Sequence, residues 1–401
     1  MLLIDRYLLR QFAQNLLIFF FSLTGLYIII DSFNNLEEFI TFAEHNRALA
    51  TQEAAASGGS GSPAATGGDQ RGNLFAIMAA YYYPRAISFF DRTSGILTLI
   101  SAMFTVTWIQ RHNELTALQA AGVAKFRVLR PVVVAVIAIA VLAAVNREFV
   151  IPQYKYELSH NAQNLGGSNG RELQPRYDNK TDILLRGQQL FAHQQRIHNP
   201  NFLLPSNLGE YGNKLSAEDA YYKPAGEKLP SGYLFVKLSP LNFDQKPSLK
   251  LSDRTVIYTP LDVPELKPGE CFVASDVTFE QLEDGGSWRQ YSSTFELVRG
   301  LRNPSLDFGA DVRVAIHARL VQPLLDVTLL FLGLPLILAQ ENRNVFRAIG
   351  MCLVLVLAFM LVVIACNYLG TAYVVNPALA AWLPLMIFVP CAVGLSDPLR
   401  A

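Results

Sequence analysis

The sequence predicts an α-helical membrane protein in which six transmembrane helices, three before and three after, flank an inserted all-β domain. The first observation is the composition: the 401 residues are 51% hydrophobic and only 16% charged, against roughly 25% charged residues in soluble proteins. The second is that long apolar runs are confined to the two ends of the chain. The third is a polar middle with repeated short strand-like segments.

Six apolar runs are candidates for crossing a bilayer, whose hydrocarbon core of about 30 Å requires ~20 residues of helix. The runs are Gln11–Ile30, Thr93–Ile109, Pro131–Val145, Leu320–Ala339, Ala348–Gly370 and Ala378–Leu395. The third is long enough if it begins near Phe126, with Arg127 and Arg130 extending to the interface. The first is too long for a signal peptide and lacks a small-residue cleavage site, so we expect it to remain as an anchor.

The basic residues of the short loops predict the orientation, because cytoplasmic loops carry an excess of lysine and arginine. With a cytoplasmic N-terminus, the inner segments carry nine basic and four acidic residues, whereas the outer loop 31–92 carries four basic and seven acidic residues. The inner basic residues are Arg6, Arg10, Arg111, Lys125, Arg127, Arg130, Arg343, Arg347 and Arg400. Both termini are therefore predicted to be cytoplasmic and the insert extracytoplasmic.

The outer loop 31–92 contains two segments of contrasting composition. Ala54–Gly72 is rich in Gly, Ser and Ala; it cannot bury enough apolar surface to offset its ordering entropy, which predicts a flexible loop. Leu74–Phe90 is rich in aromatic residues, and Tyr81–Tyr83 are typical of an interfacial belt. We expect this second segment to form a helix along the outer membrane surface, before the second span.

The insert is predicted to be a β-sandwich or open barrel, because short strand-like segments recur between turn residues. The expected strands are Asp182–Ile197 (two short strands around Gly187), Tyr233–Ser239, Leu249–Tyr258, Cys271–Leu282 and Ser287–Val298. Glu283–Gly286 is expected to form a hairpin turn, since its glycines accept a positive φ, and Pro200–Ser231 a long loop. The predicted division is 1–145 for the first three spans, 146–312 for the β-domain and 313–401 for the last three spans.

Residues 110–124, between the second and third spans, are predicted to form a separate short cytoplasmic helix. Leu115 and Leu118 mark one apolar face of this helix. Small side chains that would let another surface approach closely are Ala117, Ala120 and Ala121. Gly122 can end the helix by adopting the left-handed conformation. Such a helix would present a docking surface to a separate cytoplasmic protein.

The same segment resembles the LptF/LptG family of lipopolysaccharide-export permeases. The family pattern of a basic residue, a following glutamate and an Ala-x-Gly step is met by Arg111, Glu114 and Ala120-Ala121-Gly122. The opening Ile4-Asp5-Arg6-Tyr7-Leu8-Leu9-Arg10 and the exit of the third span, Val150-Ile151-Pro152, are also similar. The resemblance covers essentially the whole chain apart from the Gly/Ser-rich loop.

The resemblance implies an ABC-transporter subunit in the inner membrane, with a periplasmic β-jellyroll-like domain. The implied partners are a paralogous permease in a heterodimer, a dimeric cytoplasmic ATPase and a periplasmic bridge protein that receives lipopolysaccharide for outer-membrane assembly. Glu114 would contact a basic residue of the ATPase through a charge-assisted hydrogen bond; its alternative is an ordinary solvated helix position. The other residues of the implied coupling set are Arg111, Leu115, Leu118, Ala121 and Gly122.

One departure from the family pattern concerns the lipid substrate. Family members carry lysines just outside the first span, whereas Asp31–Glu38 contains no basic residue. Arg85, Arg92 and Arg147 are candidates to replace those lysines in the lipid cavity, and each can equally be an anchor at the membrane interface. Asp326 is a further candidate, because an acid inside a span is costly unless it is paired or faces a cavity. The Asp31 region favours the G-type subunit.

Other function classes are disfavoured by motifs that the sequence lacks. It contains no G-x-x-x-x-G-K-[ST] motif for nucleotide hydrolysis. Its six histidines and four cysteines show no zinc or disulfide spacing, so neither an enzyme nor a metal or cofactor is expected. The zero net charge does not suggest a nucleic-acid partner. The alternatives that remain are an ABC permease for another lipid or lipoprotein, usually with four spans, and a non-transporting membrane scaffold.

Overall fold

The computed structural model describes most of the chain, as two compact units. The described residues are 3–56, 73–165, 170–191, 194–206, 212–226, 229–239, 246–251, 254–283, 285–306, 309–338 and 345–396. The first unit, called the helical unit, comprises residues 1–36, 75–154 and 309–401. The second, called the β unit, comprises residues 37–74 and 155–308.

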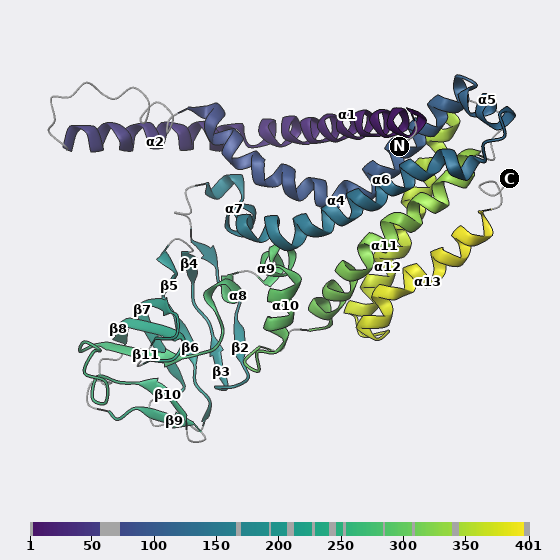
Figure 1. The fold of residues 1–401 in the computed structure, drawn as a ribbon. Helices are drawn as coiled ribbons and strands as arrows, with labels where there is room; N and C mark the ends of the chain where they lie inside the picture. Colours follow the sequence, from purple (N-terminus) through teal and green to yellow (C-terminus); the bar gives the residue numbers. More distant parts are fainter. Residues whose placement is uncertain are drawn as a thin grey trace. The chain divides into compact units, whose positions relative to one another are not determined.

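Within the described residues, six helices are long and apolar enough to cross a membrane. They are α1 (Leu3–Asn34), α4 (Leu74–Arg111), α6 (Lys125–Val145), α11 (Ala310–Leu338), α12 (Val345–Thr371) and α13 (Pro377–Gly394) (Figure 1). The three-plus-three arrangement predicted from hydropathy is confirmed. Several of the helices extend beyond the apolar runs, because the polar residues at their ends continue the same backbone hydrogen bonding.

The region before the second span differs from the prediction. Residues 74–90 are not a separate surface helix but the first half of the continuous helix α4, so that prediction is wrong. Pro84 is tolerated inside α4, because neighbouring helices and side chains can satisfy the carbonyls that a proline frees. An additional helix, α2 (Leu36–Ala56), occupies part of the outer loop, as its many Ala, Glu and Leu residues favour. The Gly/Ser-rich loop lies almost entirely outside the described residues.

Helix α6 continues past the point where the β-domain was predicted to begin. A π-helical turn (Asn146–Val150), a 3₁₀ turn (Ile151–Tyr154) and the short helix α7 (Lys155–Ser159) follow it directly. The boundary between the two compact units falls at Tyr154, inside this helical continuation. A π-helical turn inserts an extra residue into a helix and changes the direction of the following side chains.

Helix α4 is one of the two most buried spans, and a stripe of small hydroxyl residues lines its buried side. These hydroxyls donate to carbonyls of α4 itself: Thr98 to Gly95 at 2.9 Å, Ser101 to Leu97 at 2.6 Å and Thr105 to Ser101 at 2.7 Å. These hydroxyl groups therefore need no hydrogen-bond acceptor on another helix.

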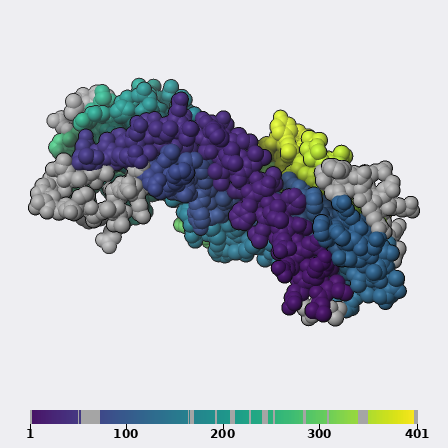
Figure 2. Space-filling view, turned by 90° about the horizontal axis from the view of Figure 1, so that it is seen from above, coloured from purple at the N-terminus to yellow at the C-terminus, as the bar shows by residue number. Residues whose placement is uncertain are grey.

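Helix α1 presents large apolar side chains on the surface of the helical unit (Figure 2, purple). The exposed apolar side chains of α1 include Leu17, Ile18, Phe21, Leu26, Ile29 and Ile30. Helix α12 exposes a similar set that includes Leu353, Val354, Leu357, Leu361 and Ile364. Apolar patches of this size are rare on soluble proteins, and they match the environment of lipid chains.

The β unit contains an antiparallel sheet that forks at one strand. The strands are β1 (Arg171–Glu172), β2 (Arg176–Asp178), β3 (Ile183–Leu185), β4 (Gln189–Phe191), β5 (Arg196–His198), β6 (Asn201–Leu203), β7 (Lys214–Lys223), β8 (Gly232–Ser239), β9 (Leu249–Leu251), β10 (Arg254–Tyr258) and β11 (Glu270–Ala274). One path runs β1-β4-β5-β7-β8-β11-β10-β9, and β2-β3-β6 branches from it at β7 (Figure 1). Strand β7 pairs with β8 along one edge and divides its other edge between β6 and β5. The inserted antiparallel β-domain is confirmed.

The long loop predicted for Pro200–Ser231 is wrong. It contains β6 and the longest described strand, β7, whose Leu215, Ala217 and Ala220 point into the core. The many Pro, Asn and Gly residues lie at the ends of these strands and obscured the alternation between them. The predicted strand Leu249–Tyr258 is instead the pair β9 and β10.

The hairpin predicted for residues 271–298 is also wrong beyond β11. The chain forms three short helices there, α8 (Phe279–Glu283), α9 (Gly285–Tyr291) and α10 (Thr294–Leu301). Helix α10 begins with a capping box, in which the Ser293 hydroxyl accepts from the Glu296 backbone N–H at 3.2 Å and Glu296 accepts from the Ser293 N–H at 3.0 Å. The Ser-x-x-Glu spacing that forms this cap was readable in the sequence, but the β-branched and aromatic residues around it favoured a strand.

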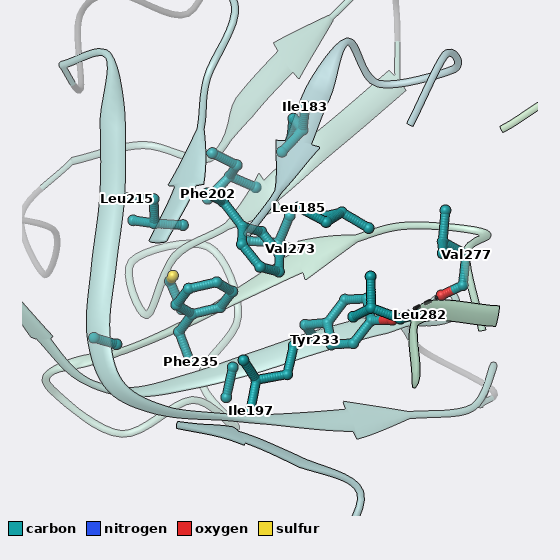
Figure 3. Packing of buried hydrophobic residues seen from close by; sticks show 14 of the residues in the cluster. Ile183, Leu185, Ile197, Phe202, Leu215, Tyr233, Phe235, Val273, Val277 and Leu282 are labelled. Atoms are coloured by element: carbon teal, nitrogen blue, oxygen red, sulfur yellow. Dashed lines mark hydrogen bonds between the residues drawn. The ribbon is translucent and has the colours of Figure 1, made fainter. Parts of the chain in front are cut away.

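The core of the β unit collects aromatic and branched side chains from both arms of the fork (Figure 3). Phe202 of β6 packs edge-to-face on Phe235 and Tyr233 of β8, with ring centroids 4.8 and 5.7 Å apart. The Tyr233 hydroxyl donates to the Val277 carbonyl at 3.0 Å, which satisfies the one polar group that the ring brings into this core. Cys271 lies in the same cluster with no exposed surface.

Cys271 should resist alkylation in the folded chain, because burial raises the pKa of its thiol and the thiolate is the reactive form. A raised pKa lowers the thiolate fraction at every pH below it, so labelling by N-ethylmaleimide should stay slow from pH 7 to 9 and become rapid in denaturant. Peptide mass spectrometry measures the labelled fraction. The exposed position 250 of β9 provides the control, Lys250→Cys, which should label quickly. Equal rates for Cys271 and the control would contradict this prediction.

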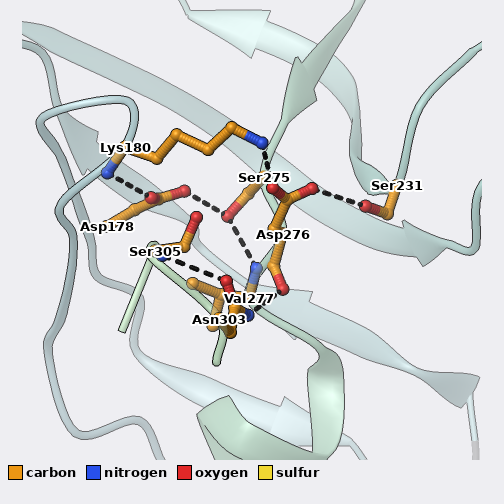
Figure 4. A network of polar contacts seen from close by, with 8 residues as sticks. All are labelled: Asp178, Lys180, Ser231, Ser275, Asp276, Val277, Asn303 and Ser305. Carbon is orange, nitrogen blue, oxygen red and sulfur yellow. Dashed lines mark hydrogen bonds and ion pairs between the residues drawn. The ribbon is translucent and has the colours of Figure 1, made fainter. Parts of the chain in front are cut away.

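A polar network ties the end of β11 to the β2–β3 turn and to the segment after α10 (Figure 4). Asp178, which has no exposed surface, accepts from the Ser275 hydroxyl at 2.6 Å and from the Lys180 N–H at 3.0 Å. Asp276 pairs with Lys180, and its carbonyl accepts from the Asn303 amide at 2.8 Å. The network fixes the segment through which the chain leaves the β unit.

Asp178→Asn is expected to destabilise the β unit by about 1–3 kcal/mol, because an amide has one acceptor oxygen and leaves either the Ser275 hydroxyl or the Lys180 N–H without its buried acceptor. Hydrogen exchange of the full chain in detergent should show faster exchange in β2, β3 and β11. The control Asp182→Asn changes an exposed acid in the same turn, so its exchange pattern should equal that of the unaltered chain. Unchanged exchange in Asp178→Asn would contradict the assigned role of the network.

Candidate functional site

The predicted helix between the second and third spans exists as α5 (Glu114–Ala120) and is separate from both α4 and α6. It is shorter than the predicted range 110–124. Asn113, just before it, has a left-handed backbone with φ 62°, which breaks the chain away from α4. At the other end, Gly122 has φ 80°, the conformation that the sequence predicted for it.

The C-terminus of α5 is a complete Schellman motif. The Gly122 N–H donates to the Gln119 carbonyl at 2.9 Å, and the Val123 N–H donates to the Leu118 carbonyl at 3.0 Å. Leu118 and Val123 are also apolar neighbours in one cluster, as this motif commonly requires. Two backbone bonds and one side-chain contact therefore fix the turn from α5 into α6.

One face of α5 is anchored on the helical unit, and another is open. Leu115 is only 6% exposed and packs in a cluster with Leu8 of α1, Ile109 of α4 and Val128 of α6. Ala117, Ala120 and Ala121 are exposed, as are Thr116 and Gly122. Helix α5 therefore exposes small side chains on one side, and its buried Leu115 packs against three transmembrane helices on the other.

The two charged residues of the predicted coupling set lie at the start of α5. Arg111 is exposed at the end of α4, and Glu114 is partly buried in the first turn of α5. The Tyr7 hydroxyl of α1 donates to Glu114 Oε1 at 3.4 Å. A hydrogen bond of this length at an exposed site is weak. Both carboxylate oxygens of Glu114 can therefore accept a hydrogen bond from another protein.

A second constellation joins α4 to the π-helical turn after α6. Arg147 Nε lies 3.0 and 3.1 Å from the two carboxylate oxygens of Asp91, and both side chains are largely buried. The neighbouring Asn146 amide donates to the Ile87 carbonyl of α4 at 3.2 Å. The π-helical turn thus directs two successive polar side chains onto α4.

Asp326 of α11 lies close to this ion pair. It is 5% exposed, accepts from the Gln322 amide at 3.0 Å, and is near enough to Arg147 and Asp91 to interact with both charges. Its carboxylate contacts the backbone of Gly95 on α4: a Cβ at position 95 would lie 2.8 Å from the Asp326 Cγ. Helices α4 and α11 approach this closely because position 95 has no side chain.

The four predicted cavity residues are therefore not one group. Arg147 and Asp326 belong to the polar cluster of α4, α6 and α11, called the interhelical polar cluster below, together with Asp91. Arg85 stays on α4, where its guanidinium lies 3.3 Å above the Tyr81 ring and donates to the Tyr81 carbonyl at 2.8 Å. Arg92 is exposed beside Asp91.

Sequence reasoning missed Asp91 and two further contacts between α1 and α4. The Tyr82 hydroxyl donates to Asp31 at 2.9 Å, and the Asn15 amide donates to Thr105 at 3.0 Å. One signal for Asp91 was present: it and Arg147 carry opposite charges at the outer ends of neighbouring spans. Opposite charges at equal depth in a membrane tend to pair.

The model of the family described as lipopolysaccharide export system permease LptF/LptG matches residues 64–397 of the 401-residue chain. The chain belongs to this family. The resemblance stated from Arg111, Glu114 and the Ala-x-Gly step is thereby confirmed, and so is the architecture of membrane helices around a β-domain.

Membership makes this LptF/LptG permease a multi-pass membrane protein of a transporter. The family description covers both the F-type and the G-type subunit, so the lean toward the G-type stays a prediction. No curated protein sequence matches the chain. The matched region contains α5 and every residue of the interhelical polar cluster.

Proposed function

We propose that this permease is one half of a heterodimeric ABC transporter that extracts lipopolysaccharide, or a related glycolipid, from the inner membrane. It passes the lipid to a periplasmic bridge protein for outer-membrane assembly. A dimeric cytoplasmic ATPase supplies the energy. Both termini and α5 face the cytoplasm, and the β unit faces the periplasm, as the distribution of lysine and arginine predicts.

The observation that carries this proposal is the construction of α5. A helix that receives force must be held firmly on its own protein and be open toward its partner. Leu115 and the Schellman turn at Gly122 supply the first property, and the exposed alanines supply the second. Glu114 offers a carboxylate for a charge-assisted hydrogen bond to a basic residue of the ATPase.

The contacts of α4 transmit a displacement of α5 to the neighbouring transmembrane helices. Helix α4 is bonded to α1 through Asn15 and Thr105 and to the turn after α6 through Asp91 and Arg147. It touches α11 at Gly95 and Asp326. Three spans therefore follow α4 when the ATPase dimer closes, and the lipid cavity between the two permeases changes shape.

Among the four candidate residues, we select those with exposed side chains as contacts of the lipid head group. Arg147 and Asp326 are engaged in the interhelical polar cluster, which gives them a structural role. Arg92 is exposed and follows Asp91 directly on α4, and Arg85 is partly exposed two helical turns earlier. Lipid phosphates approach Arg92 first, with Arg85 as the second candidate.

Purification of the permease from its native membrane in mild detergent tests the whole proposal. We expect a paralogous permease and an ATPase to co-purify, with lipopolysaccharide identified as the bound lipid by mass spectrometry. Cysteine labelling from each side of the membrane should place residues 110–130 opposite residues 155–308. Labelling of both regions from the same side, or an enriched lipid of a different class without an ATPase, would overturn the proposal.

A further inference from the structure

The helical unit contains a groove that the proposed transport path does not use. Its volume is about 570 Å³, and it lies between the start of α6, the second half of α11 and the end of α13. This volume is within the range of ~300–1,000 Å³ that accommodates one small-molecule ligand. The groove opens at the end of the unit that carries α5.

The walls of the groove are apolar. Its large side chains are Phe126, Phe331, Val389 and Val393. The two hydroxyl residues donate to nearby backbone carbonyls: Thr328 to Leu324 at 2.7 Å and Ser396 to Val393 at 2.7 Å. The described walls therefore present no hydroxyl proton to a polar occupant, and they suit a hydrocarbon chain.

The depth of the groove matches one leaflet of a bilayer. Its deepest residue on α11, Thr328, lies ten residues before Leu338, the last described residue of that helix. At ~1.5 Å of rise per residue this is ~15 Å, or half of a hydrocarbon core of about 30 Å. Ser396, just beyond α13, lies at the shallow end of the groove.

Two basic residues of α6 lie next to a lining residue of the groove. Arg130 lies one helical turn after Phe126, which lines the groove, and Arg127 follows Phe126 directly. Both arginines are exposed. Among the described residues, neither arginine forms an ion pair. Val128 packs with Leu8 of α1 on the opposite side of α6.

We propose that this groove binds an anionic phospholipid of the leaflet at the α5 end. One acyl chain occupies the apolar groove, and the phosphate is held by Arg127 and Arg130, with Lys125 beside them. Basic pockets between transmembrane helices are suited to anionic head groups, and the guanidinium fork matches phosphate oxygens. The site is distinct from the exported glycolipid and does not depend on the proposed function.

Native mass spectrometry of the delipidated full chain tests this site. The probes are dioleoyl-phosphatidylglycerol, the neutral dioleoyl-phosphatidylcholine, and glycerol 1-phosphate as a head group without chains. We expect phosphatidylglycerol to bind at least tenfold more tightly than phosphatidylcholine, and glycerol 1-phosphate not to compete. Competition by glycerol 1-phosphate would show a free phosphate site instead, and equal affinity for the two lipids would remove the role of charge.

Two variants locate the binding. Arg127→Gln with Arg130→Gln should raise the Kd for phosphatidylglycerol at least tenfold. The control, Arg6→Gln with Arg10→Gln, removes two exposed arginines one helical turn apart at the same membrane end and should leave the Kd unchanged. Ala392→Phe fills the groove and should abolish binding of both lipids. Unchanged affinity in the α6 double variant, or preferential binding of a lipopolysaccharide-type glycolipid over phosphatidylglycerol, overturns the proposal.

Discussion

Glu114→Arg is expected to reduce the ATPase recovered with the permease at least tenfold and to abolish coupled export. The substitution places a like charge opposite the basic residue that we propose on the ATPase. Loss of one partner of an interfacial charge pair costs roughly 2–5 kcal/mol, and about 1.4 kcal/mol corresponds to a factor of ten in affinity. Quantitative immunoblotting of the purified complex measures the recovery.

The variant should still fold and insert, because within the described part of the chain the Glu114 side chain accepts only the long 3.4 Å bond from Tyr7. Tyr7→Phe removes that bond alone and should leave ATPase recovery unchanged. Glu172→Arg, a charge reversal at an exposed position of β1, is the control for the general effect of charge. Export at the unaltered rate by Glu114→Arg would remove the coupling role of this residue.

Arg147→Met is expected to cause the largest loss of stability in the helical unit. It leaves Asp91 as an uncompensated buried acid beside Asp326, and breaking a buried ion pair costs about 3–5 kcal/mol. The midpoint of thermal unfolding in detergent, followed by fluorescence-detected size exclusion, should fall markedly, and little folded protein should be recovered.

A second substitution separates charge from packing at this cluster. Asp91→Asn in the Arg147→Met background removes the unpaired acid, so the double variant should recover a large part of the lost stability. Arg92→Met, at the adjacent exposed position, should change stability by no more than ~0.5 kcal/mol. An Arg147→Met variant as stable as Arg92→Met would show that the buried pair does not hold these helices together.

The sequence was sufficient for the parts of the fold that depend on one dominant physical requirement. A membrane span needs a long apolar run, and no other structure in the chain produces one, so all six were found. The left-handed end of α5 was predictable because Gly122 follows a short helix directly. The β unit was predicted only in outline, because strands as short as β3 or β6 leave too few residues to show alternation.

The residues around the candidate site were less accessible to sequence reasoning. Arg147 and Asp326 were selected because a charge in a span needs a partner, but the partner Asp91 is 56 residues from Arg147 along the chain. That pairing depends on the π-helical turn, which no local propensity indicates. Helices α8 to α10 show the opposite case: the Ser293–Glu296 cap was a local signal, but strand propensity was given more weight.

The hydroxyl stripe of α4 has a mechanical consequence. Ser101 and its neighbours keep their protons on carbonyls of α4, so a small axial shift of this helix breaks none of those bonds. Lateral bonds tie α4 to its neighbours at other points, among them Thr105 to Asn15 and Asp91 to Arg147. The energy needed to displace α4 relative to its neighbours is then set by these lateral bonds and not by the length of the contact between the helices.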